Sequence, residues 1–444
     1  MLKRFILENF SSYRDENILE LTAGRTELHP NHLVEYPNQK VKLLKSAVIY
    51  GANASGKSNL IKAMEYAKDI ITKGFNETET YKKYFRLDKK CSQKATQFEF
   101  EIELNNEFYS YGFSAILHNK QVEEEWLYKI GKSSDERIFE RKNNSIELGK
   151  KLTKNKRFNV YIEDMQNQSN ELFLSEIANK KSDRIEAEIF NNIYAWFDKK
   201  LIILHPNTKF GNISSIGSDE NLSKIFKENL AKFDTGIIDI SSIEEDFEQS
   251  FKEFPSEFKI EIEKDLTLEK AKDKKIILRG SDGLFVTIYK DKNNELKIQK
   301  LGLIHSSEVD DVFELQDESD GTKRLFDLIP LIAKFNDDYT IVIDEFDRSF
   351  HPNLTKTFFE LFYKVKNSKS QLIVTTHEST LLDLTLLRRD EIWFSEKDKS
   401  GASKLFTLNQ FKERYDKKIE KAYLSGRYGA IPIFQDFDEL EMDK

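Results

Sequence analysis

Residues 46–58 of the chain read SAVIYGANASGKS. Its first five residues form an apolar run of the length of a buried strand. The next eight, Gly51–Ser58, match the pattern G-x-x-x-x-G-K-[ST]. The residues that follow place apolar side chains on one helical face, at Leu60, Ile61, Met64, Ala67 and Ile71. A buried strand, a glycine-rich loop and an amphipathic helix in this order predict a P-loop in an α/β fold.

The residue types of this loop suit the phosphates of a nucleotide. Glycines let backbone N–H groups curl around phosphate oxygens, and the next helix points its positive dipole end at them. We expect Lys57 to reach the β- and γ-phosphates of ATP, and the Ser58 hydroxyl to ligate Mg²⁺. The other nucleotide-binding residues predicted from this loop are Gly51, Asn53, Ser55 and Gly56. A chance glycine-rich turn is the alternative, but the flanking strand and helix favour the P-loop.

A second buried strand ends in two acids. Residues 339–345 read YTIVIDE, so that Asp344 and Glu345 stand at the carboxyl end of an apolar run. Asp344 is expected to hold Mg²⁺, usually through water, and Glu345 to polarise the water that attacks the γ-phosphate. An acidic pair after a strand is more often an exposed turn. The P-loop upstream favours the Walker B interpretation.

The following strand carries a histidine near its tip. Residues 352–365 predict a helix that begins at Pro352, and Gln371–Thr375 predict a strand that completes a βαβ unit. Because the strands of such a unit are parallel, His377 is expected at the same sheet edge as Asp344. There it can hydrogen-bond the γ-phosphate or the attacking water. The alternative is a histidine with a structural role only.

A fourth signal is ESDGT at residues 318–322. Ser319 is a good N-cap for a helix over Lys323–Ala333, and the free N–H groups after it form an anion site. The alternative is that Ser319 is only a cap.

The remaining pattern splits the nucleotide-binding sheet between the two ends of the chain. Residues 2–21 predict a β-hairpin, and Thr96–Ile130 predict antiparallel strands around a turn at Asn105-Asn106. Lys151–Asp273 has a helical, charged pattern. Lys274–His305 predicts a second β meander, with turns near residues 281–283 and 293–294.

Composition narrows the class of protein. A net charge of -8 and a pI near 5.7 argue against coating nucleic acid by bulk charge, although local basic patches stay compatible with binding it. The only cysteine, Cys91, excludes disulfides within the chain and favours the cytoplasm. No apolar run reaches the about 18 residues of a membrane span, and the N-terminus lacks the pattern of a signal peptide, so no membrane association is expected.

Together these elements resemble the ABC ATPase superfamily, in the branch that includes SMC, RecF and the OLD-like nucleases. The resemblance rests on ENFSSY, on GKSN, which adds Asn59 to the nucleotide-binding residues, on ESDGT as the signature, on IDEFDRSFHP and on TTHES. More narrowly, the chain looks like the stand-alone AAA-family ATPases of bacterial anti-phage and abortive-infection systems, of the RloA and AbiL type. Tyr423–Pro432 resembles their C-terminal motif.

The resemblance implies a fold class and a division of the chain. The expected fold is α/β, an ABC-ATPase-like P-loop head with a mixed sheet split between the N- and C-terminal parts, an antiparallel β lobe and a helical insertion. The expected parts are the N-terminal part of the head at 1–150, the mainly helical insertion at 151–273, the C-terminal part of the head at 274–395 and the tail motif at 396–444.

The resemblance also implies a homodimer, or a higher oligomer, that sandwiches ATP. Ser319 and Gly321 of one copy would close over the ATP held by the P-loop of another. A single P-loop covers one side of the triphosphate, and a second anion-binding helix end can cap the γ-phosphate.

The sequence departs from the superfamily at several points. The signature keeps Ser and Gly but lacks the LSGG core, and Asp347 stands where relatives often have Glu. The Q-loop glutamine has two candidates, Gln93 and Gln97. No heptad run is long enough for an SMC-type arm, and the about fifty residues after Phe394 are too few for a Toprim nuclease domain.

The motifs predict an ATP hydrolase, and the resemblance implies that it acts as sensor or regulator in bacterial phage defence. The resemblance implies a separately encoded effector, a nuclease of the Toprim or HNH kind, and a trigger that is a nucleic acid or a phage protein. One alternative is a RecF-like, DNA-binding ATPase of DNA repair. Another is a nucleotide-gated scaffold that binds ATP with little turnover.

Overall fold

The computed structural model describes residues 1–165, 168–179, 188–208, 216, 220–252, 256–267, 275–279, 285–291, 293–308, 311–411 and 419–431. The chain forms two compact units. Unit 1 comprises Met1–Pro206, Phe335–Asp347 and Phe358–Lys444, and unit 2 comprises Asn207–Lys334 and Arg348–Thr357. Unit 1 therefore takes its residues from both ends of the sequence.

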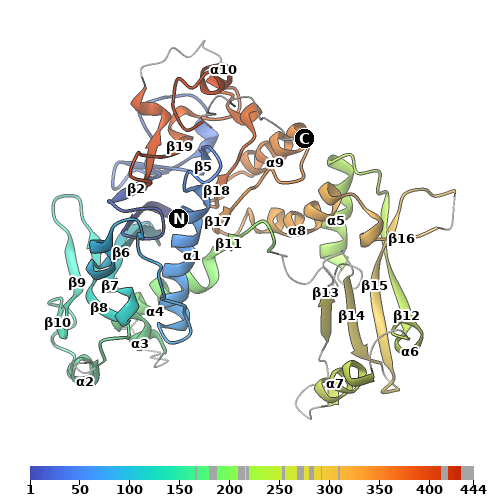
Figure 1. Ribbon diagram of the computed structural model, residues 1–444, viewed down its shortest axis with the longest axis horizontal. Helices are drawn as coiled ribbons and strands as arrows, with labels where there is room; N and C mark the ends of the chain where they lie inside the picture. The colour runs from blue at the N-terminus through green and yellow to red at the C-terminus, as the bar shows by residue number, and fades with distance from the viewer. Residues whose placement is uncertain are drawn as a thin grey trace, which may run out of the picture. The chain divides into compact units, whose positions relative to one another are not determined.

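The strands that carry the motifs lie in one six-stranded sheet of unit 1. Its order is β11 (Leu201–Leu204), β17 (Thr340–Ile343), β18 (Gln371–Thr375), β5 (Ser46–Tyr50), β19 (Ile392–Lys397) and β20 (Ser403–Thr407). The first five strands are parallel, and β20 runs antiparallel to β19. In Figure 1, β5 near the N-terminus lies between β18 and β19 of the C-terminal half. All residues of β5, β17 and β18 are buried, and the central residues of each strand are apolar, as in parallel strands covered on both faces.

A seven-stranded antiparallel sheet also belongs to unit 1. Its order is β10 (Ser145–Leu148), β9 (Glu136–Lys142), β8 (Gln121–Ile130), β7 (Glu107–Ile116), β6 (Thr96–Leu104), β1 (Leu2–Glu8) and β2 (Asn17–Glu20). The pairing of β1 with β2 confirms the hairpin predicted near the N-terminus. Asn105 and Asn106 form the turn between β6 and β7 with left-handed φ angles of 55° and 63°, which asparagine tolerates.

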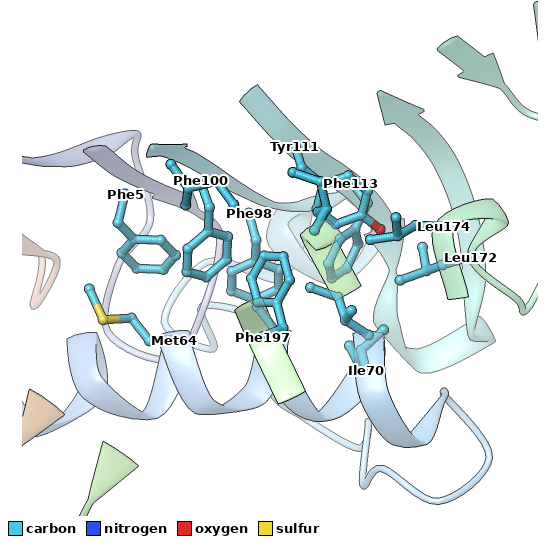
Figure 2. Packing of buried hydrophobic residues seen from close by; sticks show 14 of the residues in the cluster. Phe5, Met64, Ile70, Phe98, Phe100, Tyr111, Phe113, Leu172, Leu174 and Phe197 are labelled. Carbon is cyan, nitrogen blue, oxygen red and sulfur yellow. The ribbon is translucent and has the colours of Figure 1, made fainter. Parts of the chain in front are cut away.

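Helix α1 (Lys57–Lys73) shares one hydrophobic core with both sheets. Figure 2 shows Phe5 and Phe98 of the antiparallel sheet pointing toward α1, and Met64 of the helix lies in the same cluster. Ile49 of β5 belongs to that cluster as well. Burial of each such side chain stabilises the fold by about 1.5–3 kcal/mol. The start of α1, which follows the P-loop directly, is thereby fixed in unit 1.

The segment 151–273, predicted as a helical insertion, is divided between the two units and contains two strands. Its helices in unit 1 are α2 (Lys156–Met165), α3 (Phe173–Asn179), α4 (Glu188–Ala195) and the π-helix η5 (Trp196–Lys200). Phe173 and Phe190 pack on Phe139 of β9, so these helices cover the antiparallel sheet. Strand β11 pairs with β17, and β12 (Asp239–Asp246) belongs to unit 2. The boundaries drawn on the sequence thus differ from those of the compact units, because pairing with β17 draws β11 into unit 1.

Unit 2 has a sheet of its own. Its strand order is β12, β15 (Leu296–Ile304), β14 (Phe285–Lys290) and β13 (Ile276–Arg279), and β16 (Phe313–Glu314) pairs with β15. Its helices are α5 (Glu220–Lys232), α6 (Phe247–Ser250), α7 (Ser256–Thr267) and α8 (Asp320–Lys334). Strands β13 to β15 confirm the second meander, whose turn at 281–283 lies outside the described residues.

The remaining elements are β3 (Leu33–Tyr36), β4 (Val41–Leu44), α9 (Pro352–Lys364) and α10 (Ile419–Leu424). Helix α9 begins at Pro352 as predicted. Helix α10 overlaps the start of the tail motif, of which Pro432 lies outside the described residues. Among the helices of the described ranges, none combines the length and the apolar character that crossing a membrane requires.

Candidate nucleotide-binding and catalytic site

The predicted motifs meet at one edge of the parallel sheet. Gly51 follows β5, Asp344 follows β17, and His377 comes two residues after β18. Because β5, β17 and β18 are parallel neighbours, their carboxyl ends share an edge, which is where ligands bind in open α/β sheets. His205, which follows β11, lies at the same edge.

The P-loop has the backbone of a tight turn into a helix. Ala54 has a φ of 62° and Gly56 a φ of 118°, a conformation that glycine adopts without strain. A Cβ on Gly56 would also collide with the side chain of Ser403. Helix α1 begins at the next residue, Lys57, so its first N–H groups have no partner within the helix and can bind phosphate oxygens. Asn53 lies at the exposed tip of the loop.

The outer side of the loop is held by two strands of the C-terminal part. The carbonyl oxygen of Ser55 accepts hydrogen bonds from the hydroxyls of Ser395 in β19, at 3.1 Å, and Ser403 in β20, at 2.7 Å. All three residues are buried. Buried, satisfied hydrogen bonds of this kind fix the loop in one shape. Sequence analysis did not single out Ser395 or Ser403.

The N-terminal turn between β1 and β2 holds the loop from a second direction. The Tyr13 hydroxyl donates to the carbonyl oxygen of Gly56 at 3.2 Å. The Asn59 side-chain amide donates to the hydroxyl of Ser12 at 2.8 Å. Asn59, predicted to bind nucleotide, therefore connects the first turn of α1 to the ENFSSY segment.

Lys57 is buried within the loop. Its Nζ donates to the carbonyl oxygens of Gly51 at 2.7 Å and Ala52 at 3.1 Å. Burial lowers the pKa of Lys57 to about 8, against the opposing attraction of Asp344 and other acids nearby. The protein thus holds a desolvated amine beside the loop, where the negative charge of a triphosphate would favour its protonated form.

Asp344 and Ser58, both predicted to bind Mg²⁺, are in direct contact. The Ser58 hydroxyl donates to Oδ1 of Asp344 at 3.1 Å, and the hydroxyl of Thr375 donates to the same atom at 2.5 Å. Burial alone would raise the pKa of Asp344, but the nearby His205 ring and the hydrogen bonds from Thr375 and Ser58 bring it below its ordinary value. An ionised carboxylate beside a hydroxyl is a donor set that suits Mg²⁺.

Glu345 and His377 are held by backbone hydrogen bonds. Glu345 has a left-handed φ of 47°, and its N–H donates to the hydroxyl of Thr375 at 2.8 Å. The N–H of His377 donates to both carboxylate oxygens of Asp347 at 3.3 Å. Desolvation and the charge of Lys57 lower the pKa of His377, which favours its neutral form.

His205 is a residue of this edge that sequence analysis missed. Its Nε2 lies 2.8 Å from Oε2 of Glu65 in α1, and its Nδ1 lies 3.9 Å from Oδ2 of Asp344. The carboxylate of Asp344, and then that of Glu65, which is hydrogen-bonded to the ring, raise the pKa of His205 to about 9. The signal in the sequence was LIILHP at 201–206, in which an apolar run ends in His-Pro. It lies inside a segment whose pattern is otherwise helical.

His205 should make the stability of the ligand-free protein depend on pH. Because its folded-state pKa lies above the ordinary 6.5, its stabilisation is complete below pH 6.5 and is lost as the pH rises through about 9. The free energy of unfolding of the wild type should therefore fall between pH 6.5 and 9. In His205→Asn this fall should be smaller by about 2 kcal/mol. Urea unfolding of both proteins in EDTA measures this difference. Equal falls in the two proteins would contradict it.

The signature residues and the Q-loop candidates lie elsewhere. Ser319 and Gly321 belong to unit 2, where the Ser319 hydroxyl accepts the Thr322 N–H at 3.2 Å and so caps α8. Gly321 has no room for a side chain, because a Cβ would lie 2.8 Å from the carbonyl oxygen of Ser349. Gln93 is exposed in the 3-10 helix η2 (Lys89–Gln93), and Gln97 lies in β6. Neither glutamine belongs to the six-stranded sheet that carries the P-loop.

The fold and this edge define a P-loop ATPase of the α/β class. The chain belongs to the family described as "AAA domain, putative AbiEii toxin, Type IV TA system", whose sequence pattern matches residues 46–383, more than half of the chain. This match spans the P-loop, the acidic pair and His377.

The chain has no match among curated proteins and only weak similarity to solved structures. Among solved structures, the chain is similar to the SMC head domain from Thermotoga maritima, with 12% sequence identity, a TM-score of 0.36, and 91% of this chain and 98% of that chain covered. It is also similar to an SMC head bound to the C-terminal winged-helix domain of ScpA, with 15% identity, a TM-score of 0.36, and 91% and 97% covered.

Proposed function

We propose that the protein binds ATP with Mg²⁺ at this edge and hydrolyses it. The observation that carries the proposal is the convergence of Lys57, Ser58, Asp344, Glu345 and His377 at the carboxyl ends of three parallel strands. A cation for the phosphates, two oxygen ligands for a metal and a carboxylate for the attacking water are the parts that phosphoryl transfer to water requires. Phosphate release by the purified protein, with ATP and Mg²⁺, tests the proposal directly.

Each residue has a role that follows from its chemistry. Lys57 would bind the β- and γ-phosphates, and Ser58 and Asp344 would hold the metal. When bound, Mg²⁺ neutralises charge on the phosphate oxygens. Glu345 orients the attacking water and accepts its proton, and neutral His377 hydrogen-bonds the γ-phosphate or that water. Asp347 accepts a hydrogen bond from the backbone N–H of His377 and so fixes the position of this residue.

The site is proposed to be completed by a second copy of the chain. Ser319 ends a loop and caps α8, and the N–H groups of this first turn would provide the anion site. If α8 of one subunit caps the γ-phosphate held by its partner, a dimer contains two sites, each built from both chains. ATP is then part of the interface.

Mixing two inactive variants tests this shared site. Lys57→Ala removes the phosphate-binding cation, and Ser319→Arg removes the cap of α8 and fills the anion site with a large side chain. In a mixed dimer, one site combines both defects and the other has neither. An equal mixture that exchanges subunits freely should therefore regain about a quarter of the wild-type sites. Phosphate release that stays at the level of the separate variants, despite demonstrated subunit exchange, would rule out sharing between these two elements.

In the cell, the protein is proposed to act as the ATPase sensor or regulator of an anti-phage, abortive-infection system with a separate effector nuclease. The family description, which names a toxin of a type IV toxin–antitoxin system, supports a defence context. Within the described ranges no group of three or more His, Cys, Asp or Glu side chains is placed to hold a metal ion. Cleavage of DNA or RNA by the purified protein alone would overturn this assignment.

A further inference from the structure

Thr375, the last residue of β18, contacts both acids at the end of β17. Its hydroxyl lies 2.5 Å from Oδ1 of Asp344 and 2.8 Å from the backbone nitrogen of Glu345. An N–H group can only donate, so the hydroxyl oxygen accepts from Glu345. The single proton of the hydroxyl is therefore used on the carboxylate of Asp344. The direction of both hydrogen bonds is fixed by chemistry alone.

The backbone around Glu345 depends on these contacts. Glu345 has a left-handed φ of 47°, which is unfavourable for a residue with a side chain. The N–H of the next residue, Phe346, donates to the carbonyl oxygen of Thr375 at 3.0 Å. Thr375 thus binds three consecutive residues, 344 to 346, through its hydroxyl and its carbonyl group. This set of bonds holds the turn in which the chain leaves β17.

Packing alone does not account for threonine at this position. Thr375 is fully buried, and the other residues of β18 near it, Ile373 and Val374, are apolar. A valine would have nearly the same shape and would avoid burying a hydroxyl. The hydroxyl instead donates to the carboxylate of Asp344 and accepts from the backbone N–H of Glu345.

We propose that Thr375 is a positioning residue for ATP hydrolysis. It orients the Asp344 carboxylate toward the metal and holds Glu345 in the backbone conformation that directs its side chain to the attacking water. This inference rests on the proposed function, because it assumes that these two acids serve Mg²⁺ and water. Thr375 would act through these two acids, whose backbone and side-chain atoms its hydroxyl contacts.

The test compares two substitutions at the same position. Thr375→Val removes the hydroxyl and keeps the shape, whereas Thr375→Ser keeps the hydroxyl. We expect kcat to fall about tenfold to a hundredfold in Thr375→Val, with the Mg²⁺ concentration for half-maximal ATP binding raised about threefold or more. The Kd for ATP at saturating Mg²⁺ should stay within about threefold, because Lys57 and the P-loop are unchanged. Thr375→Ser should recover most of the loss in kcat.

Thr340 offers a matched control. It is a fully buried threonine at the other end of the neighbouring strand β17, and its hydroxyl donates to the side chain of Gln371 at 3.2 Å. Thr340→Val should lower the Tm less than Thr375→Val, since it loses one neutral buried hydrogen bond whereas Thr375→Val loses two. It should leave kcat and the Mg²⁺ dependence unchanged.

The outcomes separate this inference from the proposed function. Equal kcat values for Thr375→Val and Thr340→Val, or a Thr375→Ser variant as slow as Thr375→Val, would overturn the positioning role. If wild-type protein binds ATP without hydrolysing it, the proposed hydrolysis fails, and the Mg²⁺ dependence of ATP binding still tests the effect on Asp344. If Thr375→Val does not fold, Thr375→Ala provides the hydroxyl-free protein for the same comparison. An unchanged Mg²⁺ dependence there would likewise overturn the inference.

Discussion

Glu345→Gln should lower ATP turnover at least about a hundredfold while leaving the Kd for ATP within a few-fold of wild type. Glutamine keeps the shape of the side chain and can still orient water, but it cannot accept a proton. The left-handed backbone at Glu345, held by Thr375, is unaffected by the change. Because ATP then stays bound, the variant should accumulate in the ATP-closed assembly. Phosphate release, equilibrium nucleotide binding and light scattering with and without ATP measure the three quantities.

A charge-matched control is available in the same chain. Glu360 is exposed on α9, so Glu360→Gln removes the same charge from a position away from the sheet edge. It should leave turnover unchanged. Normal turnover in Glu345→Gln would remove this residue from the chemistry. If Glu345→Gln turns over slowly but its association state does not change with ATP, the role of Glu345 as general base is supported. The shared site is then contradicted.

The second large effect is expected from Lys57→Ala, which should abolish nucleotide binding at micromolar concentrations. A charged hydrogen bond to phosphate is worth about 1.5–3 kcal/mol, and an unneutralised triphosphate beside buried groups adds to the loss. Together these terms predict a Kd raised at least about a hundredfold. Titration with a fluorescent ATP analogue measures it.

The same substitution should not destabilise the ligand-free protein. Burial lowers the pKa of Lys57 to about 8, below its ordinary value, so the charged amine is less stable in the folded state than in the unfolded state. This cost is present in full below pH 8 and is relieved as the pH rises from about 8 to 10.5. The Tm of Lys57→Ala at pH 7 should therefore equal or exceed that of wild type. Lys62→Ala, which removes an exposed lysine from α1, is the control for binding. Tight ATP binding by Lys57→Ala would refute the P-loop assignment.

Local patterns in the sequence predicted the parts of the site that lie within one strand–loop–helix segment. The run before Gly51, the glycine-rich loop and the apolar face of α1 correspond to β5, the P-loop and α1 as expected. The strand before Asp344 and the strand before His377 are likewise confirmed as parallel neighbours. Such segments are readable because burial on both faces of a strand, or on one face of a helix, leaves a periodic signal.

The features that sequence analysis missed depend on contacts between distant residues. Strand β11 has four residues among helices, and only its pairing with β17 makes it part of the sheet. His205 could not be assigned before that pairing was known. Thr375 and Ser403 look like ordinary strand residues in the sequence. The residue type alone does not show whether its hydroxyl bonds to another part of the chain or faces solvent. The division into two units also follows from long-range packing rather than from composition.

The bracing of the P-loop by residues from distant parts of the chain also bears on how the protein is made. The Ser403 and Ser12 hydroxyls are 2.8 Å apart although 391 positions separate them in the sequence. Both neighbours of β5, β18 and β19, are likewise translated long after it. A nascent chain on the ribosome therefore carries the GANASGKS segment for most of its synthesis without the partners that shape it. Competence to bind ATP should arise late and abruptly during translation, so that truncated products do not consume nucleotide.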